Sequence, residues 1–264
     1  MTHLKIILSA LLCLPMAVNG YCGTNAQTTR SEKQWNSYNV GKIEFEDKAP
    51  DTEGSKIYHR IITNPEDYIA SQARTVLSTL YFSPKDSIPR VKAIHYTLEN
   101  IDGISAKGGD HNVTTIFYST RHIEKSFAQN DTARLFFETR GVLLHELTHA
   151  YQLEPQGIGN YGSNKTFWAF IEGMADAVRV MCGGFHQTDR PKGGRYDSGY
   201  RTTGYFLAWI AKKYDRNFLR KFNQSALHVI PWSFDGGVKY ALGKKYSVDK
   251  LWHEYQMAVG DIKK

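Results

Sequence analysis

Cysteine is scarce in this sequence, which contains only Cys13, Cys22 and Cys182 and has no C-x-x-C pair. The missing pair argues against a zinc site built from cysteine thiolates. Cys13 lies in a segment that we expect to be removed, so Cys22 and Cys182 are the two residues that could form a disulfide. The sequence leaves open whether they pair or whether Cys182 is a buried thiol.

Long hydrophobic runs are also missing, apart from residues 6–18 near the N-terminus. This run follows Lys5, is too short for a comfortable membrane span and leads into small residues, which is the pattern of a signal peptide. We therefore predict a signal peptide over residues 1–20 and a secreted or periplasmic protein. Lipid anchoring at Cys22 is the less favoured alternative, because the three residues before it form a poor lipoprotein signal.

The sequence has no recognisable nucleic-acid motif, although its formal net charge is +7. Its basic residues are scattered, mostly in pairs such as Lys212-Lys213 and Lys244-Lys245, so we expect solvated faces and no nucleic-acid partner. Removal of residues 1–20, which hold Lys5 and no acid, leaves a charge of 32 − 26 = +6. A charge of this sign allows association with an anionic cell surface or cell wall. We expect a monomer.

Internal repeats are not evident either, and a composition of 41% hydrophobic and 22% charged residues is that of a globular chain. Residues 21–40 are polar and aperiodic, which predicts a flexible leader. Residues 41–264 are long enough to bury one core, and we predict that they form a single domain.

Hydrophobic spacing and turn residues divide this domain into strands and helices. The predicted strands are residues 42–45, 56–62, 91–98 and 113–119. The predicted helices are residues 65–81, 133–152, 166–182, 199–214, 218–222 and 247–258. Gly103 and Gly108-Gly109 indicate a loop before the last strand. The C-terminal part is thus mainly helical, and the fold class is α+β.

One predicted helix carries the sequence GVLLHELTHAYQ, residues 141–152. His145 and His149 are four residues apart, so both imidazoles lie on one face of a helix and can bind one metal ion. A catalytic zinc site needs a third protein ligand, and Glu172 on the next helix is the candidate. A bare H-E-x-x-H also arises by chance in amphipathic helices, but the helical context and the second acidic helix favour a metal site.

Other residues near this motif suit the hydrolysis of an amide bond by a zinc-activated water. Glu146 is the predicted general base, with a surface salt bridge as the alternative. Asp176, one helical turn after Glu172, can accept the second N–H of a metal-bound histidine, with a cap or salt bridge as the alternative. Tyr200 is the first candidate for a donor to the oxyanion, and Tyr205 is the second.

Two glycine features accompany the motif. Gly141 stands one turn before His145, where glycine costs about 1 kcal/mol relative to alanine, so we expect another element to approach closely there. The segment 157–162, which follows the helix, is rich in glycine and is expected to border the substrate cleft.

Three blocks of the sequence share the pattern of a known family. They are His145-Glu146-x-Thr148-His149 with Gln152, Ile171-Glu172-Gly173-x-Ala175-Asp176-x-Val178-Arg179, and Gly199-Tyr200-x-x-Thr203-x-x-Phe206-Leu207. Over roughly residues 55–225 the sequence resembles the basic secretory protein family of plants and bacteria, a group of zincin-like metallopeptidases. The N-terminal region and the small number of cysteines depart from that family.

The resemblance implies a secreted protein with a zincin-like α+β fold, in which a small mixed sheet packs on the metal-binding helix. It implies Zn²⁺ held by His145, His149 and Glu172, and it favours Tyr200 over Tyr205. In zincin-type peptidases a strand near the metal helix is commonly a sheet edge that binds an extended peptide. Residues 113–119 are therefore expected to be either such an edge or an ordinary paired strand.

Three functions are compatible with these residues. The leading hypothesis is a secreted zinc metallopeptidase that hydrolyses peptide bonds in a peptide or protein substrate. The alternative from another class is a non-catalytic secreted protein that uses the zincin scaffold to bind a peptide or a cell-wall glycan, against which the intact Glu146 argues. Zinc-dependent hydrolysis of a non-peptide amide or of a glycan-linked peptide would use the same site.

Overall fold

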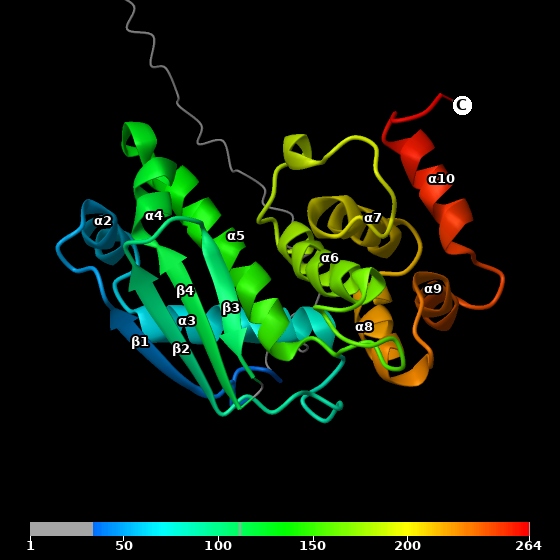
Figure 1. Cartoon of the computed structure of the whole chain (residues 1–264), viewed down its shortest axis with the longest axis horizontal. Helices are drawn as coiled ribbons and strands as arrows, with labels where there is room; N and C mark the ends of the chain where they lie inside the picture. The colour runs from blue at the N-terminus through cyan, green and yellow to red at the C-terminus, as the bar shows by residue number, and fades with distance from the viewer. Residues whose placement is uncertain (1–33, 111, 264) are drawn as a thin grey trace, which may run out of the picture.

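The computed structural model describes residues 34–110 and 112–263. Within these residues the chain forms a four-stranded sheet and nine α-helices, which lie in two neighbouring parts (Figure 1). The sheet and helices α2 to α5 make one part, and helices α6 to α10 make the other. The α+β class, the small mixed sheet and the mainly helical C-terminal part predicted from the sequence are confirmed.

The sheet contains three parallel strands and one antiparallel edge strand. Across the sheet the order is β1 (Lys42–Asp47), β2 (Ala93–Glu99), β4 (Val113–Ser119) and β3 (Ser105–Gly109). β1, β2 and β4 run parallel, and β3 runs antiparallel to β4. Parallel neighbours need a crossover connection, so the chain passes through α2 (Glu53–Ile61) and α3 (Pro65–Leu80) between β1 and β2. The strands predicted at residues 42–45, 91–98 and 113–119 are confirmed.

The strand predicted at residues 56–62 is wrong, because this segment lies in helix α2. Ile57, Tyr58 and Ile61 form an apolar stripe with helical spacing. Over so few residues this stripe also resembles an imperfect alternation of apolar and polar residues, which is why a strand was predicted. Thr52 supplies the start signal, since its hydroxyl accepts a hydrogen bond from the Ser55 N–H at 3.2 Å. A side-chain cap and a first-turn acid outweigh the β-propensity of the isoleucines.

The loop predicted from the glycines before residue 113 is also wrong, because residues 105–109 form strand β3. Glycine is tolerated here since β3 lies at the edge of the sheet and packs closely on β4: a Cβ on Gly108 would lie 2.8 Å from Thr115 Oγ1. The strand at residues 113–119 is paired on both sides, by β2 and by β3. It is therefore the ordinary paired strand of the two alternatives, and β3 is the edge.

The remaining helices follow the sequence prediction closely, with two additions. They are α4 (Thr120–Ser126), α5 (Thr132–Tyr151), α6 (Lys165–Met181), α7 (Tyr200–Lys213), α8 (Phe218–His228), α9 (Phe234–Leu242) and α10 (Val248–Ala258). The side chains of Asp131 and Asn164 cap α5 and α6. Helices α4 and α9 were not predicted, and α8 continues beyond residue 222. No described helix is long and apolar enough to cross a membrane.

The packed part of the chain begins before residue 41. Trp35 is buried in the core, with 1% of its surface exposed. Tyr151, at the end of α5, donates a 2.6 Å hydrogen bond to the Val40 carbonyl. Residues 34–40, which the sequence assigned to the leader, therefore belong to the packed part of the chain, where the side chains of Trp35 and Val40 are buried.

Several predictions concern residues outside the described part of the chain. The signal peptide, residues 21–33 of the leader and Cys22 all lie there. Cys182 is described: it is half-buried, with its Sγ 3.6 Å from Thr79 Oγ1. Pairing of Cys22 with Cys182 stays a prediction.

Candidate metal centre

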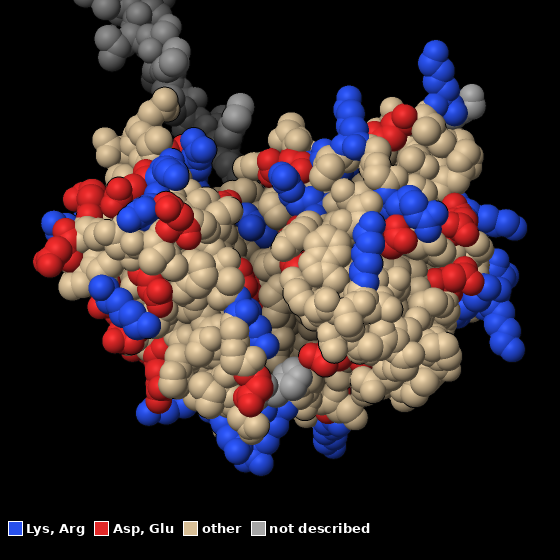
Figure 2. Space-filling view, in the orientation of Figure 1, with Lys and Arg blue, Asp and Glu red and all other residues tan. Residues whose placement is uncertain are grey.

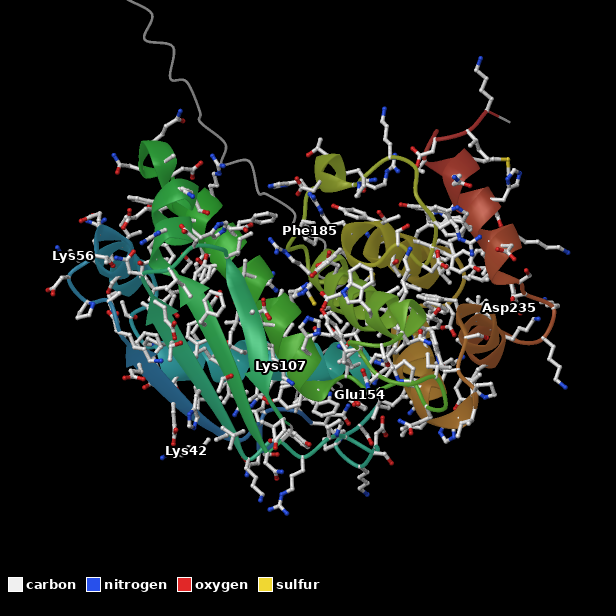
Figure 3. All side chains as sticks on the ribbon, in the orientation of Figure 1. Lys42, Lys56, Lys107, Glu154, Phe185 and Asp235 are labelled. Atoms are coloured by element: carbon white, nitrogen blue, oxygen red, sulfur yellow. The ribbon has the colours of Figure 1, made fainter. Side chains whose placement is uncertain are left out.

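A cleft of about 940 Å³ separates β3 and α5 on one side from α6, α7 and the loops next to them on the other. Figure 2 shows a furrow between the two parts of the molecule. Three residues that line the cleft are labelled in Figure 3: Phe185 lies toward one end, Glu154 toward the other, and Lys107 on β3. Every candidate site residue named from the sequence lines this cleft except Tyr205.

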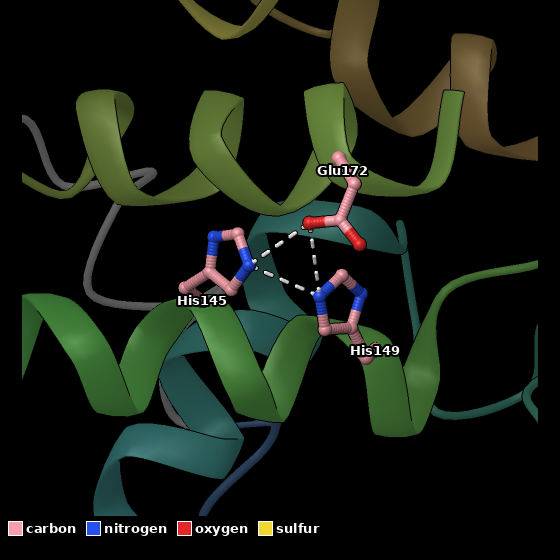
Figure 4. Close-up of side chains that lie close together, drawn as sticks. All are labelled: His145, His149 and Glu172. Atoms are coloured by element: carbon pink, nitrogen blue, oxygen red, sulfur yellow. Dashed lines mark hydrogen bonds and ion pairs between the residues drawn. The ribbon is translucent and has the colours of Figure 1, made fainter. Parts of the chain in front are cut away.

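At the floor of the cleft, two histidines from α5 meet a glutamate from α6 (Figure 4). The Nε2 atoms of His145 and His149 lie 3.1 Å apart. Oε2 of Glu172 lies 3.3 Å from Nε2 of His145 and 3.6 Å from Nε2 of His149. The three ligand atoms lie within 4.8 Å of one another, so the predicted set can hold a metal ion.

Small residues bring the two helices together. A Cβ on Gly141 would lie 2.6 Å from Nε of Arg179, on α6, which confirms the close approach expected at this glycine. Gly204 of α7 serves in the same way, since a Cβ there would lie 2.7 Å from the Cβ of Asp176. The glycines thus let α5 and α7 approach the two sides of α6, which carries Glu172.

The outer nitrogen of each histidine has a polar partner. Nδ1 of His145 lies 2.7 Å from a carboxylate oxygen of Asp176, and Nδ1 of His149 lies 2.9 Å from the amide nitrogen of Gln152. The Asp176 carboxylate can only accept, so His145 carries a proton on Nδ1, and its Nε2 faces the site, where it can bind a metal once it has lost its own proton. The buried side-chain oxygen of Gln152 has no hydrogen-bond partner among the described residues. Rotation of the Gln152 amide by half a turn would place this oxygen at Nδ1 of His149, where it would accept a hydrogen bond as Asp176 does from His145. The donors and their partners therefore fit a metal ion.

The charges at the centre depend on each other. Burial disfavours charged imidazoles, but hydrogen bonds to Asp176 and Glu172 outweigh it and raise the pKa of His145 to about 10. Burial, together with the positive charge of His145, lowers the pKa of His149 to about 3. Burial also opposes ionisation of Glu172, yet its hydrogen bond to His145 and the nearby imidazoles lower the pKa of this carboxyl. The centre thus holds one proton on His145, and a metal cation could replace this proton.

Glu146 lies on the β3 side of the cleft and is 6% exposed. Burial raises the pKa of its carboxyl, while the positive charge of His145 and the proximity of the Ser105 side chain and the Lys107 backbone N–H act in the opposite direction. The net effect is a raised pKa. A buried carboxylate that is held in place beside a metal centre is suited to accept a proton.

The two tyrosines proposed from the sequence have different positions. Tyr200 lines the cleft, and its ring stacks on His145 with 6.1 Å between the centroids and 12° between the planes. Burial and the nearby Glu172 carboxylate raise the pKa of the Tyr200 phenol. Tyr205 is turned away, because its hydroxyl donates to the backbone carbonyl of His186. Of these two tyrosines, only Tyr200 reaches the candidate metal centre.

The backbone at Tyr200 is in the left-handed region, with φ +40°, and Gly199 before it has φ +74°. A Cβ on Gly199 would lie 2.6 Å from the ring of Trp168, so this turn needs glycine. A non-glycine residue with such a φ costs on the order of 1–3 kcal/mol, and such strain is concentrated at functional sites.

Tyr161 is a residue of the site that the sequence analysis missed. Its hydroxyl donates a 2.6 Å hydrogen bond to Oε1 of Glu172, whereas Oε2 is the oxygen that lies near both histidines. The glycine-rich segment 157–162 was expected to border the cleft, and it does so through this side chain. No periodic signal could single out one tyrosine in an irregular loop. The role of Gln152 was likewise unassigned, although it belongs to the first sequence block.

The comparison with known proteins agrees with the sequence blocks. A family model described as BSP, peptidase of plants and bacteria, matches residues 40–255, which include the whole sheet and all candidate site residues. No curated protein and no solved structure matches the chain. The resemblance to the basic secretory protein family is confirmed, and the chain belongs to this family of peptidases of plants and bacteria.

Proposed function

We propose that the protein is a zinc-dependent peptidase with a zincin-like fold. The observation that carries the proposal is the convergence of His145, His149 and Glu172 at the floor of a cleft, with Glu146 beside them. Two imidazole nitrogens and one carboxylate oxygen form a donor set that suits zinc. Bound there, zinc would polarise the substrate carbonyl and lower the pKa of a water molecule to about 7.

Glu146 is the general base of the proposed reaction. Its carboxylate takes a proton from the attacking water and passes it to the leaving nitrogen. The peptide C–N bond then breaks, and the products are a carboxylic acid and an amine. The raised pKa of Glu146 suits both steps, because a base that is too weak could not take the proton. The neighbouring residues Ser105 and Lys107 of β3 keep the carboxylate on the side where the substrate would enter.

The substrate adds to strand β3 in the proposed complex. β3 is paired with β4 on one side only, so its other edge offers backbone N–H and C=O groups to an extended peptide. The Ser119 N–H donates to the Ile104 carbonyl and the Asp110 N–H to the Val113 carbonyl, so the backbone groups of the alternate residues 105 and 107 are directed away from β4. Of these groups, the Lys107 N–H faces Glu146, and the others face the side on which a peptide would add. The cleft lies on that side.

The phenol groups of Tyr200 and Tyr161 can stabilise the developing oxyanion. Tyr200 and Tyr161 approach Glu172 from different elements, α7 and the loop before α6. Each phenol can donate its O–H to the oxyanion that develops during the reaction, Tyr161 by turning from Glu172. Tyr200→Phe and Tyr161→Phe should lower kcat more than they raise KM, and their ratio measures the share of each donor.

The experiment is a measurement of zinc content and of the cleavage of a diverse peptide library, made with the wild type and with Glu146→Gln. We expect one zinc per chain, cleavage that a chelator abolishes, and a Glu146→Gln variant that keeps zinc but loses activity. Stoichiometric zinc without cleavage would instead favour the non-catalytic binding protein or hydrolysis of a non-peptide amide. Absence of zinc would overturn the site assignment.

We also propose that the protein acts outside the cytoplasm, since residues 1–20 have the pattern of a signal peptide. Mass determination of the N-terminus of the mature protein tests this. A chain that begins near residue 21 supports export, whereas an intact Met1 on the active protein contradicts it.

A further inference from the structure

The side chain of Tyr200 is only partly enclosed, although it lies at the candidate metal centre. It is 48% exposed, so packing alone does not fix its direction. Its ring stacks on His145 and meets the Trp168 ring edge to face, with 5.5 Å between the centroids and 77° between the planes. Because the rotamers open to a side chain depend on its backbone angles, the direction of the phenol depends on the turn from which α7 begins.

This turn has an unusual backbone. Gly199 and Tyr200 both have positive φ, and such a conformation persists only where surrounding contacts hold it. Gly199 is also the N-cap of α7, a position where a serine, threonine, aspartate or asparagine side chain usually binds the first free N–H groups. Glycine has no such side chain, and this end of α7 has no side-chain cap of the usual kind. The turn therefore needs contacts from another residue.

Thr203, in the first turn of α7, supplies these contacts. Its hydroxyl accepts a 2.8 Å hydrogen bond from the Gly199 N–H and donates a 2.7 Å hydrogen bond to the Tyr196 carbonyl. A hydroxyl group has one hydrogen to donate and lone pairs that accept, so a single side chain can serve both backbone groups. The Thr203 hydroxyl thus joins the two ends of the segment that leads into Tyr200.

Thr203 is itself fixed against α6. Its side chain is fully buried, and a Cβ on Gly173 would lie 2.3 Å from Cγ2 of Thr203. A buried side chain in such close contact is confined by its neighbours. Gly173 directly follows Glu172, the candidate metal ligand. Thr203 therefore connects the turn before Tyr200 to the part of α6 that carries Glu172.

We propose that Thr203 is a positioning residue, whose hydroxyl holds the turn at residues 196–199 and so directs the Tyr200 phenol toward the oxyanion. The inference rests on the proposed peptidase function, in which Tyr200 is an oxyanion donor. Thr203 is buried behind the turn and acts through Tyr200. A displaced donor loses its bond to the transition state, so the effect should be on kcat more than on KM.

The first test is Thr203→Val, which keeps the branched shape of the side chain and removes the hydroxyl. We expect kcat to fall about 10–100-fold with little change in KM, since a displacement of about 1 Å at a reacting group can cost that much. The zinc content should stay that of the wild type. Thr203→Ser keeps the hydroxyl and should retain most of the wild-type kcat.

A second test places Thr203→Val in the Tyr200→Phe background. If Thr203 acts through the Tyr200 phenol, removal of that phenol first should leave Thr203→Val with no further effect on kcat. A general loosening of the fold would instead lower kcat by the same factor in both backgrounds. Thermal unfolding of each variant shows that the assays are made on folded protein.

Thr120→Val is the matched control. Thr120 is also fully buried, but it lies in α4, in the other part of the molecule (Figure 1), and its hydroxyl has no hydrogen-bond partner among the described residues. The control makes the same exchange without breaking a hydrogen bond, so it should keep the wild-type kcat and KM. A loss equal to that of Thr203→Val would trace the effect to the exchange itself and would overturn the inference.

A readout without turnover is the fluorine NMR spectrum of the protein made with fluorotyrosine, in which Tyr200→Phe identifies the Tyr200 signal. The rings of His145 and Trp168 should shift this signal away from that of a solvated tyrosine. Thr203→Val should move it toward the solvated position, whereas Thr203→Ser and Thr120→Val should leave it in place. If Thr203→Val does not fold, Thr203→Cys, which has a weaker hydrogen-bonding group, should move the signal in the same direction.

The outcomes separate the two proposals. If the wild type cleaves no peptide, the peptidase function fails, and the fluorine signal alone decides whether Thr203 positions Tyr200. If the wild type cleaves peptides but Thr203→Val keeps the wild-type kcat, acts equally in the Tyr200→Phe background or leaves the Tyr200 signal in place, the inference is overturned and the peptidase function stands. A Thr203→Ser variant as impaired as Thr203→Val would also overturn the inference.

Discussion

Asp176 on α6 holds His145 on α5 through a 2.7 Å hydrogen bond, one helical turn after Glu172 on the same helix. A single face of α6 therefore supplies both the third candidate metal ligand and the acceptor that orients His145. The spacing of four residues makes this possible, since side chains at i and i+4 lie above each other. The two helices are connected through this pair at the point where a metal would bind.

Asp176→Asn should weaken metal binding about 10–100-fold, because an amide no longer guarantees the proton on Nδ1 of His145. Competition with a chromophoric chelator measures the affinity. Asp249→Asn, at an exposed position on α10, is the control and should match the wild type. Unchanged affinity in Asp176→Asn would mean that this carboxylate does not orient the ligand.

Gln152→Ala should weaken metal binding about tenfold or more, since His149 loses the partner of its Nδ1 at 2.9 Å. Gln152→Glu keeps an acceptor at this position and should restore most of the affinity. If Gln152 acted through packing alone, the glutamate would be no better than the alanine. The pair of variants, measured by the same competition, decides between these roles.

Metal binding should release about one proton at pH 7. Without metal, His145 is charged because its pKa is raised to about 10, and His149 is neutral because its pKa is lowered to about 3. Both must be neutral to bind a metal ion, so one proton leaves and the affinity should rise about tenfold per pH unit around neutrality. Titration calorimetry in buffers of different ionisation enthalpy counts the protons. A count of zero would contradict this charge distribution.

Gly173→Ala should destabilise the fold by about 1–2 kcal/mol, although alanine is the better helix former. The added Cβ would lie 2.3 Å from Cγ2 of the fully buried Thr203, so α7 would have to move away from α6. Thermal or urea unfolding measures the loss. Thr203→Ser removes Cγ2 and keeps the hydroxyl, so the double variant should recover part of the stability. Purely additive effects would argue against this contact.

The sequence predicted the helices of the site well because their signals are local. Asp131 and Asn164 cap α5 and α6, and the four-residue spacings of His145 with His149 and of Glu172 with Asp176 act within one helix. Periodicity and capping involve neighbours in the chain, so they can be read without knowing the fold. The three sequence blocks shared with the family indicated, in addition, that these segments belong to one site.

The residues that the sequence missed are those placed by distant parts of the chain. Tyr161 reaches Glu172 from an irregular loop, and residues 105–109 become a strand only because β4 pairs with them. The segment 56–62 shows the opposite error, where a helical stripe was mistaken for alternation over too few residues. Loop conformation and strand pairing depend on long-range contacts, which local propensity does not contain.

The sequence by itself therefore determined the helix that carries the two candidate histidine ligands, its partner helix and the identity of the candidate ligands, because helical geometry converts spacing directly into position. The tertiary structure alone decided which strand forms the edge of the sheet and which tyrosines lie near Glu172. These are relations between elements far apart in the chain, and packing sets them, with Gly141, Gly173 and Gly204 allowing the helices to approach closely.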